Sequence, residues 1–143
     1  MISNLKKVII GTAHFGTRYG LKGEKENIKN IKSIINYLNK NKVEIILDCS
    51  DNYKDTFKFI KKLLNKKKFK FKLIYKIKVD IPLNNKKILE DFLFLKIKKI
   101  SRYFHIDYKN IILMTHNENI ILKRKFNLLY DVFAILKKKK IDI

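Results

Sequence analysis

The chain has 143 residues, of which 46% are hydrophobic and 12% aromatic, so its length and composition are those of one globular domain and exclude a disordered chain. Its formal net charge of +21 at pH 7 implies non-specific attraction to polyanions. No apolar run approaches the roughly 18 residues that span a membrane, and the N-terminal segment lacks the apolar centre of a signal peptide. The single cysteine, Cys49, excludes an internal disulfide, and we expect a cytoplasmic protein.

Short β-branched runs and longer stretches of helical periodicity alternate through the first half of the chain. We expect strands at Val8–Thr12 and Val43–Asp48. The helix between them, Asn27–Asn41, should bury one apolar stripe: Ile28, Ile31, Ile34, Ile35 and Leu38. The helix after the second strand, Asp55–Lys66, should bury three apolar side chains: Phe57, Ile60 and Leu64.

The same alternation continues in the second half, with strands expected at Lys72–Ile77 and Asn110–Thr115. Pro82 indicates a loop after the first of these strands. The long helix Asn85–Phe104 should direct four side chains inward: Ile88, Phe92, Leu95 and Ile100. A last helix, Lys123–Lys139, has one apolar face made of Phe126, Leu129, Tyr130, Phe133 and Leu136, and the final "IDI" could begin a fifth strand.

Four successive strand–helix units predict an α/β fold with a parallel sheet, because parallel strands need a crossover connection that is usually a helix. The strand segments read as nearly continuous apolar runs, which is typical of parallel strands that are buried on both faces. No linker divides the chain, so we expect a single domain over residues 1–143. In such folds ligands bind at the carboxyl ends of the strands.

Residues that are small or chemically active lie at or near these strand ends: Gly11 and Thr12, Asp48 and Tyr53, Lys76, and His116 with Asn117. A tyrosine has an ordinary pKa of about 10 and is a weak acid at neutral pH, but a neighbouring ammonium stabilises its phenolate. A carboxylate would hold the lysine, and a histidine could orient a carbonyl oxygen by a hydrogen bond. The set is therefore suited to acid–base chemistry on a carbonyl, whereas the cysteine and the histidines show no metal-ligand spacing.

Four segments resemble motifs of the aldo-keto reductases. "VIIGTAHFGTRYGL" resembles the opening of the branch that begins with a GTAQFG-type motif, and "ILDCSDNY" is similar to the family's DTA-x-x-Y motif. "IYKI" is similar to the strand that carries the family lysine, and "HIDYKNIILMTHN" resembles the segment that ends in the family histidine. The four motifs occur in the family's order and at plausible spacing.

The resemblance implies a catalytic set of four residues. Tyr53 would be the proton donor and Lys76 the group that lowers its pKa. Asp48 would form an ion pair with the lysine, and His116 would orient the substrate. Asp51 and Asn52, between the aspartate and the tyrosine, would then be turn residues.

The resemblance also implies a ligand set. Gly11, Thr12 and Asp48 would lie near the nicotinamide of NADP, and His116 and Asn117 would contact a small carbonyl substrate. The implied function is NAD(P)H-dependent carbonyl reduction. The choice of NADP over NAD as the cofactor rests on the resemblance alone.

The sequence departs from the family pattern in composition and in length. Cys49 and Ser50 replace the usual Thr-Ala, Lys54 replaces the usual glycine, and Arg18 occupies a position that is often acidic. The family fold is a (β/α)8 barrel of about 250 residues, so this chain would be its N-terminal half. The last strands, which normally hold the NADP phosphates, are not part of it. We therefore expect a half-barrel that is inactive alone, and that self-associates or pairs with a complementary C-terminal half.

Without the family, each residue has a simpler role: Asp48 as a turn or helix cap, Tyr53 as a partly buried aromatic, and His116 as a structural histidine. Lys76 is one of many lysines, although a lysine in a buried strand needs a charged partner. A basic module that binds nucleic acid or another polyanion is the alternative function. Only three of the 34 basic residues are arginine, the residue best suited to base edges and phosphates, so we do not expect nucleic-acid binding. A remnant without selected function is a third reading.

Overall fold

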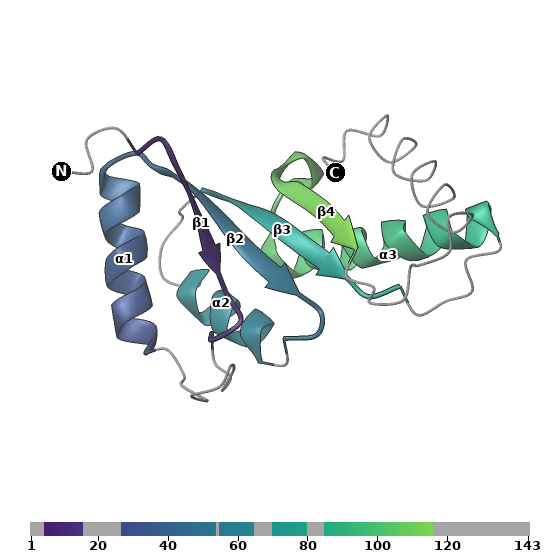
Figure 1. The fold of residues 1–143 in the computed structure, drawn as a ribbon, viewed down its shortest axis with the longest axis horizontal. Helices are drawn as coiled ribbons and strands as arrows, with labels where there is room; N and C mark the ends of the chain where they lie inside the picture. The colour runs from purple at the N-terminus through teal and green to yellow at the C-terminus, as the bar shows by residue number, and fades with distance from the viewer. Residues whose placement is uncertain (1–4, 16–26, 54, 65–69, 80–84, 116–143) are drawn as a thin grey trace. The chain divides into compact units, whose positions relative to one another are not determined.

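A computed structural model of the chain describes residues 5–15, 27–53, 55–64, 70–79 and 85–115 (Figure 1). The chain divides into two units, Met1–Ile74 and Tyr75–Ile143, and each is described by itself. The predicted last helix and the predicted fifth strand lie outside the described residues.

Strands and helices alternate along the described chain, as the sequence predicts. The elements, in order, are β1 (Lys7–Gly11), α1 (Ile28–Lys40), β2 (Glu44–Ser50), α2 (Thr56–Leu64), β3 (Phe71–Ile77), α3 (Lys86–Phe104), a short 3-10 helix η1 (Tyr108–Asn110) and β4 (Ile111–Thr115). The four strands are parallel and form one sheet in the order β1-β2-β3-β4. This confirms the predicted α/β fold, which corresponds to half of a TIM-type barrel.

In the first unit, β1 and β2 run side by side in the same direction (Figure 1). The register pairs Lys7 with Glu44 at the start of the strands and Gly11 with Asp48 at their carboxyl ends. Side chains alternate along a strand, and partners in register share a face. Gly11 and Asp48 therefore belong to one face of the sheet.

Each helix of the first unit buries one apolar face. α1 contacts β2 and α2, and it buries Ile31, Ile35 and Leu38 as predicted. Ile34 was expected in the same stripe, but it is 54% exposed because it lies at the edge of the buried face. The prediction for α2 was correct for one side chain only. Ile60 is buried, whereas Phe57 and Leu64 are half-buried, and the other buried apolar residues of α2 are Phe59 and Leu63.

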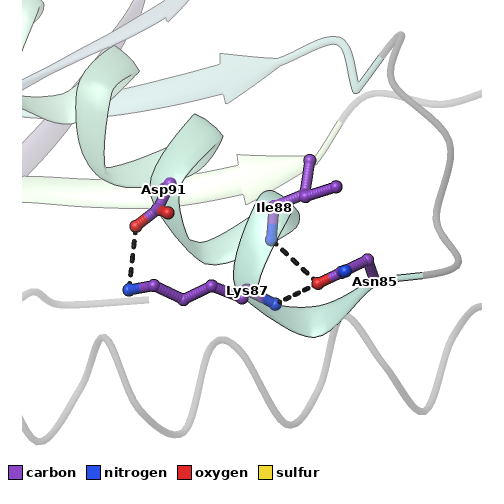
Figure 2. Close-up of polar contacts among 4 residues, drawn as sticks. All are labelled: Asn85, Lys87, Ile88 and Asp91. Carbon is purple, nitrogen blue, oxygen red and sulfur yellow. Dashed lines mark hydrogen bonds and ion pairs between the residues drawn. The ribbon is translucent and has the colours of Figure 1, made fainter.

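In the second unit, α3 begins with a well-formed cap (Figure 2). The side-chain oxygen of Asn85 accepts hydrogen bonds from the backbone N–H groups of Lys87 at 2.9 Å and Ile88 at 3.2 Å. The Lys87 ammonium pairs with the Asp91 carboxylate one turn later at 3.1 Å. The two hydrogen bonds to Asn85 satisfy two of the free N–H groups in the first turn, which explains why the helix starts where the sequence predicts.

The buried face of α3 differs from the predicted one. The buried residues are Leu89, Leu93, Ile97, Ile100 and Phe104. Of the four side chains expected inside, only Ile100 is buried. Ile88 and Leu95 are 52% and 64% exposed, and Phe92 is half-buried. α3 carries two apolar stripes one residue apart, about 100° around the helix, so periodicity alone does not select between them.

None of the described helices is long and apolar enough to cross a membrane.

Candidate functional site

The structure places three of the four predicted catalytic residues in described elements. Asp48 lies in β2 and Tyr53 in the turn that follows it, both in the first unit. Lys76 lies near the end of β3, in the second unit. His116 and Asn117, the predicted substrate contacts, lie outside the described residues.

Gly11 is the last residue of β1, and it pairs in register with Asp48, two residues before the end of β2, so the two share a face of the sheet. Asp48 is half-buried, and its Oδ1 atom is enclosed by protein. Gly11 is exposed, and a Cβ atom added there would meet nothing within 4 Å. The carboxyl ends of β1 and β2 therefore border open space beside a partly enclosed carboxylate, which is where parallel sheets place their ligands.

A tight turn brings Tyr53 back toward the end of β2. The backbone N–H of Tyr53 donates to the Ser50 carbonyl at 3.1 Å, and the backbone N–H of Asn52 donates to the Ser50 Oγ at 3.2 Å. Ser50 is fully buried, whereas Tyr53 is half-buried. The turn predicted at Asp51 and Asn52 is present. Ser50, which anchors this turn, was noted from the sequence only as a departure from the family motif.

A second anchor joins the loop after β1 to the end of β2. Thr12 is fully buried, and both its N–H and its Oγ1 donate to the Asp48 carbonyl, at 3.1 and 2.7 Å. The prediction that Gly11 and Thr12 lie near a nicotinamide stays a prediction. In this structure the Thr12 side chain points into the protein and fixes the backbone of Asp48.

Thr56, the first residue of α2, extends this anchor and was not singled out from the sequence. Its fully buried Oγ1 donates to the carbonyls of Thr12 and Phe15, each at 3.3 Å. The Phe15 N–H donates to the Thr12 carbonyl at 2.9 Å, and the Phe15 and Phe59 rings pack with centroids 5.3 Å apart. The loop is thus held by buried hydrogen bonds and by ring packing. A threonine at the start of a helix was the only sequence signal for it.

Cys49 follows Asp48, and its thiol contacts the Thr12 side chain inside the protein and not the open space beside Gly11. Its side chain alternates to the opposite face of β2 and is fully buried. Burial, which is the largest effect, raises the pKa of the thiol to about 12, so the group is neutral at ordinary pH. A neutral buried thiol is a poor nucleophile and metal ligand. Within the described ranges, no three His, Cys, Asp or Glu side chains gather as a metal site.

Lys76 belongs to an alternating strand. Phe71, Leu73, Tyr75 and Ile77 are buried, whereas the residues between them are half-buried. Lys76 therefore lies on the same face of β3 as Lys72. In the first unit the Lys72 Nζ is 2.9 Å from the Glu44 Oε1, and the Lys7 Nζ is 3.6 Å from the Glu44 Oε2. The hydrogen bond from Lys72, reinforced by Lys7, holds the pKa of the Glu44 carboxyl below its usual value.

Comparison with solved structures identifies the same fold in two Pseudomonas aeruginosa structures, both described only provisionally as aldo-keto reductases. The first matches with a TM-score of 0.59 and 14% identity, over 98% of this chain and 55% of the other. The second matches with a TM-score of 0.59 and 12% identity, over 98% of this chain and 53% of the other. The chain thus spans about half the length of the structures it matches. No protein-family model and no curated protein sequence matches it.

Proposed function

We propose that this chain contributes the catalytic side chains of a carbonyl reductase of the aldo-keto reductase type. The observation that carries the proposal is the end of β2, where Asp48 borders the open space at Gly11 and a turn anchored on Ser50 returns Tyr53. The fold shared with structures assigned to that class supports it. So does the order of the four sequence motifs.

The proposed chemistry is proton donation to a carbonyl oxygen. The Tyr53 hydroxyl gives its proton to this oxygen as a hydride reaches the carbonyl carbon, so that the C=O group becomes CH–OH. The Lys76 ammonium stabilises the phenolate that remains, and the Asp48 carboxylate holds the ammonium in place. His116 orients the substrate oxygen. The resemblance of "IYKI" to the strand that carries the family lysine supports the part of Lys76.

Reduced NADP, when bound, supplies the hydride. The residues that would hold its nicotinamide are Gly11 and Asp48, which border the open space at the carboxyl ends of β1 and β2. The nicotinamide would fit here because Gly11 has no side chain to fill the space beside Asp48. Thr12 contributes indirectly, through its two hydrogen bonds to the Asp48 carbonyl.

We further propose that the active form includes strands from a complementary half or from a second copy of the chain. Ile9 shares its face of β1 with Gly11 and is 57% exposed, although a closed barrel fills this face with side chains from all its strands. An exposed isoleucine beside a candidate site is consistent with a face that another segment covers. Either a second copy of the chain or a complementary half could supply the segment that covers this face.

The experiment measures NADPH binding and NADPH-dependent reduction of an aromatic aldehyde. The chain is tested alone and after co-expression with the C-terminal half of a solved reductase of the same fold. We expect no turnover by the chain alone and measurable turnover by the pair. Tyr53→Phe should lower that turnover by at least about 100-fold while NADPH affinity stays within about threefold, since a phenyl ring has the same shape but no proton to give. Turnover that survives Tyr53→Phe would contradict the assigned role, and a co-purified pair that binds no NADPH would contradict the proposed function.

A further inference from the structure

The C-terminal half of α3 carries several cations and no carboxylate. Residues 92–106 contain no Asp or Glu, although the first turns of the helix contain both. Two lysines, one arginine and two further residues of this half line a shallow hollow of about 510 Å³: Leu95, Lys98, Lys99, Arg102 and Tyr103. This hollow lies within the second unit, and it uses none of the residues proposed for carbonyl reduction.

The three cations of the hollow differ from those lysines of the described chain that have a carboxylate partner. Lys72, Lys87 and Lys109 each pair with a carboxylate, at 2.9, 3.1 and 3.4 Å. Within the described residues, no ion pair engages the two lysines or the arginine of the hollow. The negative end of the helix dipole favours a cation in the last turn, where only Arg102 lies. The helix dipole therefore does not account for the positions of Lys98 and Lys99.

The hollow also presents an aromatic ring held in place by a buried neighbour. The Tyr103 ring packs edge-on against Phe104, with centroids 4.9 Å apart and an angle of 87° between the planes. Phe104 is 5% exposed, so it supports the half-buried tyrosine from inside the unit. Leu95, which is 64% exposed, adds an aliphatic surface at the other end of the hollow. A cationic hollow with a supported aromatic ring is the combination that binds single-stranded nucleic acid.

We propose that this hollow binds single-stranded nucleic acid. Lys98, Lys99 and Arg102 contact phosphates of the strand, and a base stacks on Tyr103. The scarcity of arginine over the whole chain argues against base-edge recognition, so the binding is independent of sequence and sensitive to salt. An anionic membrane surface fits less well, because it requires a broad apolar face, and Leu95 is the one aliphatic residue that lines the hollow.

Two triple variants of equal charge separate this site from the general attraction of a chain with net charge +21. The α3 triple variant replaces the cations of the hollow: Lys98→Gln, Lys99→Gln and Arg102→Gln. The α1 triple variant is the matched control and replaces lysines of another helix that likewise have no ion pair within the described part of the chain: Lys29→Gln, Lys32→Gln and Lys40→Gln. Binding of a fluorescein-labelled twelve-residue oligo(dT) is followed by fluorescence anisotropy from 0.05 to 0.3 M salt, and circular dichroism checks that each variant is folded.

The expected effect follows from counterion release. Each phosphate contact on a single strand contributes about 0.7 to the slope of log K against log salt, so losing three contacts should lower the slope by about 2 and the affinity at 0.1 M salt by about 100-fold. The α1 triple variant should bind within about threefold of the unmodified chain. Equal weakening in the two triple variants would overturn the proposal, because general charge would then explain the binding.

The aromatic contact has its own test. Tyr103→Leu should weaken oligo(dT) binding by at least about fivefold, whereas Tyr103→Phe should leave it within about twofold, since stacking needs the ring and not the hydroxyl. Equal affinities for the leucine and phenylalanine variants would contradict the stacking of a base on Tyr103. Binding to phosphatidylserine vesicles with no binding to oligo(dT) would show a membrane surface instead and overturn the proposal.

Discussion

Two leucines on α3, two residues apart, test which apolar stripe of this helix is buried. Leu93 is 0% exposed and Leu95 is 64% exposed, although both belong to periodic apolar stripes in the sequence. Replacing each with alanine removes the same atoms from the same helix. The two variants therefore differ mainly in what surrounds the side chain.

The expected magnitudes differ several-fold. Leu93→Ala removes a fully enclosed side chain and leaves a cavity, which should lower the free energy of unfolding by about 2–5 kcal/mol. For Leu95→Ala, complete burial of a leucine is worth about 2 kcal/mol, of which roughly a third applies to a side chain that is 64% exposed. Alanine is also a slightly better helix former, so the net loss should be about 0.5 kcal/mol.

The assay is urea unfolding of the full chain followed by circular dichroism at 222 nm. The ratio of the two losses is the deciding quantity, because it is independent of the chain's total stability. A loss for Leu95→Ala equal to or larger than that for Leu93→Ala would refute the buried face described above. It would favour the stripe through Ile88 and Leu95 that the sequence predicts.

Two further predictions concern the first unit. Since the folded-state pKa of Cys49 is raised from 9.0 to about 12, its contribution to stability should be complete below pH 9.0 and be lost as pH rises toward 12. Relative to Cys49→Ala, the unmodified chain should lose about 1.4 kcal/mol of unfolding free energy per pH unit in that window, and parallel profiles in urea melts would contradict a buried thiol. Thr56→Val removes the hydroxyl that donates to the Thr12 and Phe15 carbonyls and should lower the free energy of unfolding by about 1–2 kcal/mol. The control Ser33→Ala removes an exposed hydroxyl bond of α1 and should cost less than about 0.5 kcal/mol; similar losses in the two variants would argue against the buried anchor.

The sequence by itself determined where most described elements begin and end, because these boundaries depend on local interactions. Asn27 and Asn85, expected at the starts of two helices, are their N-caps. The Asn27 side chain accepts a hydrogen bond from the Lys29 N–H, and the Asn85 side chain accepts from the N–H groups two and three residues later. The apolar run that ends at Asp48 forms a buried strand, and this strand continues two residues beyond Asp48. The order of strands and helices then implied parallel pairing, since each crossover contains a helix.

The tertiary structure alone decided which of several equivalent faces is buried and how the strand ends are held. On α3 two stripes satisfy the helical period, and only packing selects the one through Leu93. The hydrogen bonds from Thr12 and Thr56 join residues 36 and 44 positions apart, so no local pattern encodes them. Motif spacing predicts Asp48 and Tyr53 as site residues. The turn anchored on Ser50 is local, whereas the open space beside Gly11 and Asp48 exists only once β1 and β2 are paired.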